Sequence, residues 1–173
     1  MERTIIGIDP GKGGGIAIIK KGRAYAVSMP ATLPQLNEYL KDIRNNNDEI
    51  IAFVEKVQIF DSDDKEDGKK YGIKKMLDQF AELKSCLVFH NIPFVEVAPI
   101  TWQSELCLTS KGDTKAVRKN KYKLFAGRTF PDAKVNLNTS DALCISYFGI
   151  QRLKLNPGWV NERIVKKKTD LFK

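Results

Sequence analysis

Histidine and cysteine are scarce in this chain of 173 residues, and their scarcity removes whole classes of chemistry. A single histidine, His90, argues against a catalytic triad built on histidine. The three cysteines, Cys86, Cys107 and Cys144, lie far apart and form no Cys-x-x-Cys pair, which argues against a disulfide framework or a zinc site. We therefore expect reduced, mostly buried thiols in a cytoplasmic or other reducing compartment. Any catalysis by this chain must therefore use carboxylates, lysines or hydroxyls.

Long hydrophobic runs are also missing. The most apolar stretch, residues 142–150, includes Ser146 and falls far short of the ~20 residues that span a bilayer, so we expect no membrane segment. The chain is 42% hydrophobic and 29% charged, as is usual for one globular domain, here residues 1–173 with a basic tail over 155–173. Its net charge, 29 − 21 = +8, favours a polyanionic partner such as nucleic acid or an acidic membrane surface.

The hydrophobic pattern predicts three strands, then alternating helices and strands. Apolar runs that end at turn residues indicate a three-stranded antiparallel meander over about 4–28. We expect helices over 33–43 and 73–87, strands over 49–54 and 93–97, and a loop with one or two helical turns over 99–106. Two further helices are expected over 114–126, between Asp113 and Gly127, and over about 138–153. This order predicts an α/β fold with a mixed five-stranded sheet flanked by helices.

Three carboxylates stand at the boundaries of apolar elements. Asp9 ends the first strand, Glu55 ends the fourth, and Asp141 lies in the first turn of the last helix. If the first and fourth strands are parallel neighbours, their carboxyl ends open into one crevice. A carboxylate cluster without histidine or cysteine selects hard cations such as Mg²⁺ or Mn²⁺, and two such ions can hydrolyse a phosphodiester.

Each of these residues also has a purely structural interpretation. Asp9-Pro10-Gly11 is a turn tripeptide, and Glu55 could be a solvated strand end. Asn138 and Asp141 have the spacing of a capping box. The glycine-rich run over 11–15 leads into a strand rather than a helix, so we interpret it as a tight turn and exclude a P-loop. The acids over 61–67 have the pattern of a solvated loop.

The helix over 114–126 is strongly basic. Lys115, Arg118, Lys119 and Tyr122 share one face at helical spacing, and Lys111 adds to the positive charge beside it. A solvated face usually mixes signs, so we interpret this one as a surface that contacts phosphates. Two aromatic residues could stack on bases, Phe60 and Trp102, although a tryptophan in an apolar setting is more often part of the core.

Four segments together resemble the RuvC-type Holliday junction resolvases, especially compact phage and viral relatives. They are Ile5 to Gly11, Ala52 to Val57, the helix of Lys115, and Asn138 to Tyr147, in the family's order across about 145 residues. The resemblance implies a ribonuclease H-like fold, a homodimer, and paired symmetric nicking of four-way DNA junctions with two Mg²⁺ ions, for which Mn²⁺ can substitute. It also implies a compartment that contains DNA, and no small-molecule cofactor.

The resemblance assigns roles to individual residues. Asp9, Glu55 and Asp141 match the family's metal carboxylates, and Lys115 matches its basic residue near the scissile phosphate. Asn138 stands where the family has a fourth carboxyl, so it would contribute a neutral ligand. Gln58 stands where the family often has an aromatic wedge, which leaves Phe60 as the candidate wedge. The alternatives are a nuclease for other branched DNA, RNA or RNA–DNA hybrids, and a non-catalytic module that binds junctions.

Overall fold

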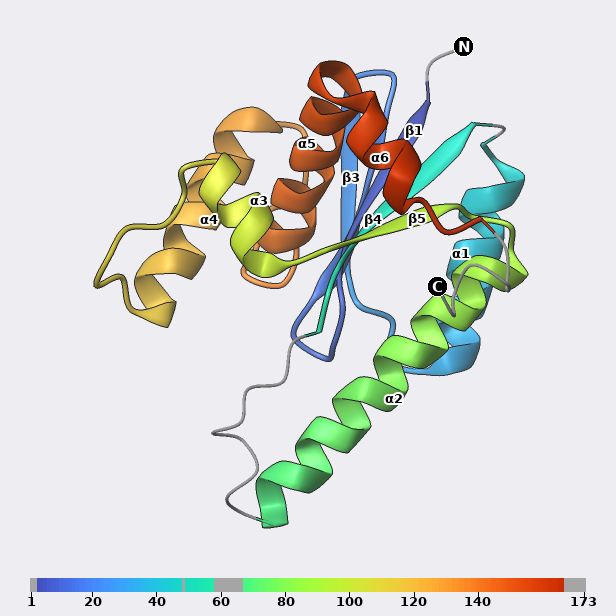
Figure 1. Ribbon diagram of the computed structural model, residues 1–173, viewed down its shortest axis with the longest axis horizontal. Helices are drawn as coiled ribbons and strands as arrows, with labels where there is room; N and C mark the ends of the chain where they lie inside the picture. The colour runs from blue at the N-terminus through green and yellow to red at the C-terminus, as the bar shows by residue number, and fades with distance from the viewer. Residues whose placement is uncertain (1–2, 48, 58–66, 167–173) are drawn as a thin grey trace.

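The computed structural model describes residues 3–47, 49–57 and 67–166, with side chains of the long central helix from residue 72 onward. Figure 1 shows its helices and strands. The strands are β1 (Thr4–Asp9), β2 (Gly15–Lys20), β3 (Arg23–Ser28), β4 (Ile50–Glu55) and β5 (Phe94–Val97). The helices are α1 (Leu33–Asn45), α2 (Asp67–Phe89), α3 (Pro99–Glu105), α4 (Lys115–Thr129), α5 (Ser140–Leu155) and α6 (Pro157–Arg163).

The five strands form one mixed sheet in the order β3-β2-β1-β4-β5. The strands β1, β2 and β3 pair antiparallel, whereas β4 lies parallel to β1 and β5 lies parallel to β4. The expected mixed sheet is therefore confirmed. Because β1 and β4 are parallel neighbours, Asp9 and Glu55 end adjacent strands at the same edge of the sheet.

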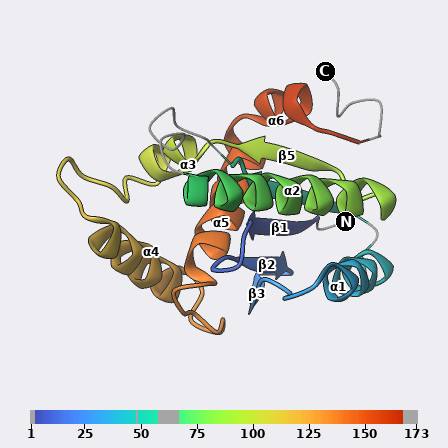
Figure 2. The ribbon, with the colours of Figure 1, turned by 90° about the horizontal axis from the view of Figure 1, so that it is seen from below.

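Each face of the sheet has its own hydrophobic core, because side chains alternate between the two faces of a strand. Helices α1 and α2 cover one face, over Ile6 and Ile8 of β1. Helix α5 crosses the other face, with α3 and α4 beside it (Figures 1 and 2). Gly7 permits this close crossing, since a Cβ there would lie 2.1 Å from the backbone oxygen of Ala142.

The ends of two helices differ from the prediction. Helix α4 begins at Lys115 and is capped by Thr114, whose Oγ1 accepts from the backbone of Val117, while Asp113 accepts from the backbone of Ser110 and from Lys121. Helix α5 begins after Thr139, so Asn138 lies outside it and forms no capping box with Asp141. A loop held by Asn136 takes that place. Side-chain to backbone hydrogen bonds in these turns decide where each helix begins, and the spacing of apolar residues does not predict them.

The described part of the expected basic tail contains a helix, α6, and a strand contact at Val165. Asn156 caps α6 through its side chain, which accepts from the backbone of Trp159. Val160 is buried against the main core, and Val165 pairs with Phe94 at the outer edge of β5. None of the helices in the described ranges combines the length and apolarity that crossing a bilayer requires.

Candidate active site

Three carboxylates from distant parts of the chain converge on the α5 side of the sheet. Asp9 and Glu55 reach this place from the ends of β1 and β4, and Asp141 reaches it from the first turn of α5. Asp9 is 9% exposed and Asp141 is 5% exposed. The site is therefore a partly desolvated acidic cluster, in which charges interact more strongly than at an open surface.

Lys119 of α4 provides a positive charge among these carboxylates. Its Nζ lies 2.7 Å from Oδ2 of Asp141 and 3.9 Å from Oδ2 of Asp9. Burial alone lowers the pKa of Lys119, but the hydrogen bond to Asp141 and the nearby acids raise it above its ordinary value. One ammonium faces three carboxylates, so the cluster carries more negative than positive charge when all of these groups are ionised.

Glu55 is held by a different partner. The indole Nε1 of Trp102 donates to Oε2 of Glu55 at 2.7 Å. Trp102 is fully buried and lies edge-on against Tyr122 of α4, with ring centroids 5.0 Å apart. Trp102 therefore belongs to the core, as the more common interpretation of a tryptophan in an apolar setting predicted. It links α3 and α4 to the carboxylate at the end of β4.

The surroundings of Asp9 and Glu55 favour the protonated, uncharged form of both carboxyl groups. Burial, together with Glu55 and Asp141, raises the pKa of Asp9 from its ordinary value of 3.8 to about 8. Burial also raises the pKa of Glu55 from 4.5 to about 7, against the hydrogen bond from Trp102. Both pKa shifts have the same main cause, which is the burial of the carboxyl group; the neighbouring acids add to it, and the charge of Lys119 opposes it without cancelling it.

The residues present fit a divalent cation by donor chemistry and by charge. Carboxylate oxygens are the ligands that Mg²⁺ prefers, and the excess negative charge is of the sign that such an ion would compensate. Within the described ranges, however, no three acidic, histidine or cysteine side chains are arranged as ready ligands. Lys119 lies against two of the carboxylates, and Trp102 holds the third. Binding an ion would require these side chains to shift.

Asn138 lies beside the cluster rather than inside it. Its Nδ2 donates to Oγ of Ser28 at 3.5 Å, at the end of β3. Its backbone oxygen lies so close to Gly15 that a Cβ there would come within 2.6 Å of it. Gly15 is the partner of Asp9 in the β1–β2 ladder, which places the Asn138 backbone one strand away from the carboxylates.

Within the described residues, the expected nucleic-acid contacts separate into three groups. Lys111, Lys115 and Arg118 are exposed along the start of α4 and the loop before it. Lys119, placed on the same face by the sequence, instead contacts the carboxylates. Tyr122 is 3% exposed, so the structure corrects its expected surface role: the ring packs in the core against Trp102. Phe60 lies outside the described residues, as do positions 61–66 of the acidic loop.

Two features of the site were absent from the sequence interpretation. The first is the position of Lys119 between Asp9 and Asp141, and the second is the indole that donates to Glu55. A signal existed for Lys119, because residue 119 and the buried Tyr122 are three positions apart and share a helix face. No local pattern connects residue 102 to residue 55.

The order and pairing of the strands define the fold. Three antiparallel strands followed by two parallel strands, with helices on both faces and carboxylates at the ends of β1 and β4, form a ribonuclease H-like fold. Among solved structures, the chain is similar to RuvC of Thermus thermophilus. One such structure, RuvC in complex with a Holliday junction substrate, is 12% identical with a TM-score of 0.59, and the match covers 90% of this chain and 97% of that one.

A second Thermus thermophilus RuvC structure is 16% identical, with a TM-score of 0.55 and coverage of 88% of this chain and 96% of the other. At these identities the likeness establishes the fold. No protein-family model matches the chain, and no curated protein matches it.

Proposed function

We propose that this chain is a structure-selective DNA endonuclease that resolves four-way junctions with paired symmetric nicks. The observation that supports the proposal is the convergence of Asp9, Glu55 and Asp141 at one edge of a sheet that shares its topology with RuvC. The neighbour structure contains a Holliday junction substrate, which supports branched DNA as the partner. In each nick, one water adds to the phosphorus and the P–O3′ bond breaks, leaving a 5′-phosphate and a 3′-hydroxyl.

In this proposal, Asp9, Glu55 and Asp141 would hold two Mg²⁺ ions, with Mn²⁺ as a substitute. Asn138 would have to turn its side chain from Ser28 toward the cluster to serve as a neutral ligand. When bound, such ions activate a water and stabilise the leaving oxygen. The surrounding residues orient the carboxylates: Trp102 fixes one oxygen of Glu55, and the hydroxyl of Ser140 donates to Oδ1 of Asp141 at 3.0 Å.

Lys119 and Lys115 have different parts in this scheme. Lys119 already lies at the carboxylates, so it is well placed to offset the negative charge that develops on a phosphate there. The resemblance assigned this charge-offsetting role to Lys115, but Lys115 is exposed at the first turn of α4, one turn before Lys119, and Lys119 is the lysine that contacts Asp9 and Asp141. We assign Lys115, with Lys111 and Arg118, to contacts with the DNA backbone on the path toward the site.

Two equivalent nicks require two active centres, and we therefore propose a homodimer as the working unit. The thiols of Cys86, Cys107 and Cys144 are free, which is consistent with a cytoplasmic or other reducing compartment that contains DNA. We propose no small-molecule cofactor.

The test is a labelled synthetic four-way junction incubated with the chain, with and without Mg²⁺. We expect paired nicks only with the ion, and we expect Asp9→Asn to abolish cleavage while junction binding persists. Asp132→Asn is the matched control, because Asp132 is an exposed aspartate that does not belong to the cluster of Asp9, Glu55 and Asp141. Cleavage by Asp9→Asn at the wild-type rate would refute the assignment. Comparing the junction with a fork and an RNA–DNA hybrid defines the preferred substrate.

One observation favours a second candidate function, a junction-binding module without catalysis. Lys119 fills the space between two of the carboxylates, and Asn138 brings no charge. Tight junction binding, with no cleavage in either Mg²⁺ or Mn²⁺, would favour this alternative over the nuclease.

A further inference from the structure

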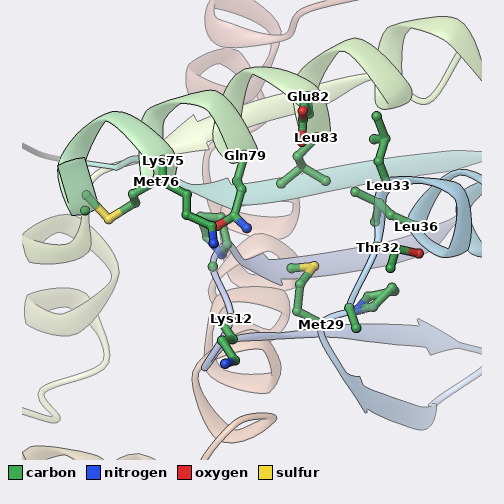
Figure 3. Close-up of a pocket in the computed structure, with 15 residues that line it drawn as sticks. Lys12, Met29, Thr32, Leu33, Leu36, Lys75, Met76, Gln79, Glu82 and Leu83 are labelled. Atoms are coloured by element: carbon green, nitrogen blue, oxygen red, sulfur yellow. The ribbon is translucent and has the colours of Figure 1, made fainter.

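A hollow of about 570 Å³ lies on the opposite side of the sheet from the carboxylates. It is bounded by the turn after β1, by the segment that joins β3 to α1, and by the outer part of α2 (Figure 3). Its volume lies within the range of sites that take small molecules or single groups of larger ones. The hollow is distinct from the acidic cluster, but the two share the turn that follows Asp9.

The chemistry of the hollow changes from one end to the other. In Figure 3, Lys12 and Lys75 lie toward one end, and Leu33 and Leu36 lie toward the other, with Met29 between them. Both lysines are exposed, and neither forms an ion pair with an acid of the described ranges. The hollow therefore offers positive charge at one end and an apolar floor with a flexible thioether beside it, and one carboxylate, that of Glu82, also lines it.

The positive end adjoins the candidate active site. Lys12 follows Asp9 by three residues, a reach of at most ~11 Å along the chain. That distance is comparable with two or three nucleotides of a strand, at ~3.4 Å each along a helix axis. A strand held at the carboxylates can thus cross the β1–β2 turn and present its next phosphate to Lys12 and Lys75.

We propose that this hollow receives an unpaired base of the strand that is cut, with Lys12 and Lys75 contacting the flanking phosphates. This inference rests on the proposed function and specifies how the substrate is selected. A base that enters the hollow leaves water and packs against the side chains of Met29 and Met76. The sugar-phosphate backbone of that nucleotide stays outside, near the two lysines. Fully paired DNA cannot supply such a base without unstacking it, so the hollow favours junctions and other DNA with open base pairs.

The experiment compares junctions that carry either a normal base or an abasic site at each of the three nucleotides on either side of the nick. Binding is measured with Asp9→Asn, which keeps the DNA intact. We expect the abasic site at one of these positions to weaken binding about tenfold, the equivalent of ~1.4 kcal/mol. In a background that also carries Lys75→Ala and Met76→Ala, we expect the same abasic site to change affinity less than about twofold.

Lys74→Ala is the matched control, because Lys74 is exposed on the same helix but does not line the hollow. It should keep the full abasic effect. An abasic effect of equal size in the Lys75→Ala, Met76→Ala background would overturn the inference and leave the nuclease proposal intact. A change in oligomeric state on substitution, without any abasic effect, would assign the hollow to a second copy of the chain and also overturn it. Failure of the chain to bind junctions at all would defeat the proposed function itself.

Discussion

The indole of Trp102 donates to Oε2 of Glu55 at 2.7 Å and thereby holds the carboxylate at the end of β4 in one orientation. The donor is fully buried, so the hydrogen bond is protected from competition with water. Partners of this kind commonly tune how strongly a carboxylate binds a metal ion.

Trp102→Phe should therefore weaken Mg²⁺ binding about tenfold, because it keeps most of the packing and removes the N–H. Isothermal titration calorimetry without DNA measures this directly. Trp159→Phe is the control, since Trp159 packs on Phe148 in the same core but away from the carboxylates. Unchanged affinity with a lower melting temperature would show that Trp102 contributes packing alone.

Removing Lys119 should destabilise the metal-free protein. Lys119→Met leaves the buried carboxylates of Asp9 and Asp141 and the half-buried one of Glu55 without their ammonium. Breaking a buried pair commonly costs ~3 to 5 kcal/mol, and we expect the lower end here because the side chain of Lys119 is 27% exposed. We expect a lower melting temperature in EDTA and a larger gain on adding Mg²⁺ than in the wild type. Lys123→Met, on an exposed part of the same helix, should change neither value. If Mg²⁺ raised the melting temperature of both variants by the same amount, the proposed competition between the ammonium of Lys119 and the metal ion would be contradicted.

Stability without metal should fall as the pH rises. The folded chain raises the pKa of Asp9 from 3.8 to about 8, so Asp9 ionises less readily in the folded state than in the unfolded state. The resulting loss of stability is zero below the lower pKa, grows between the two values and is complete above the higher one. Asp9→Asn should raise the melting temperature in EDTA by at least ~3 °C at about pH 8 and by less at about pH 5. Asp132→Asn should show no such trend. A gain for Asp9→Asn that is independent of pH would exclude the ionisation of Asp9 as its cause.

The contact between β1 and α5 has no room for a side chain. Gly7→Ala would place its Cβ 2.1 Å from the Ala142 oxygen and 2.5 Å from the Ser146 nitrogen. Both are backbone atoms of α5, so we expect destabilisation by ~3 kcal/mol or more, measured by chemical unfolding. Gly13→Ala is the control, because nothing lies within 4 Å of the added atom. Similar losses for both variants would contradict the close approach.

Binding of a four-way junction should weaken steeply with added salt. Lys111, Lys115 and Arg118 are exposed near the start of α4, and each phosphate contact that they make releases counterions. Between ~50 and ~200 mM salt we expect affinity to fall by orders of magnitude, and Lys115→Ala should reduce the slope by about one. Lys41→Ala, on the distant helix α1, should leave the slope unchanged. An unaltered slope for Lys115→Ala would remove that residue from the DNA path.

The sheet and the three carboxylates were predictable because their signals are local. Apolar runs that stop at Asp9 and Glu55 mark strand ends, and parallel pairing brings such ends to one edge. The partners of these acids could not be predicted in this way. Trp102 contacts Glu55 through tertiary packing across 47 positions, and Thr139 replaces Asn138 at the helix start because a local loop uses different hydrogen bonds.

The pairing of Phe94 with Val165 shields the outermost parallel strand with the chain's own last described segment. Shortening the polypeptide before Val165 would remove that pairing and leave the amide and the carbonyl of Phe94 without their partners at the outer edge of β5. An exposed strand edge can pair with strands of other molecules, so we expect a chain that ends before Val165 to associate more readily than the full chain.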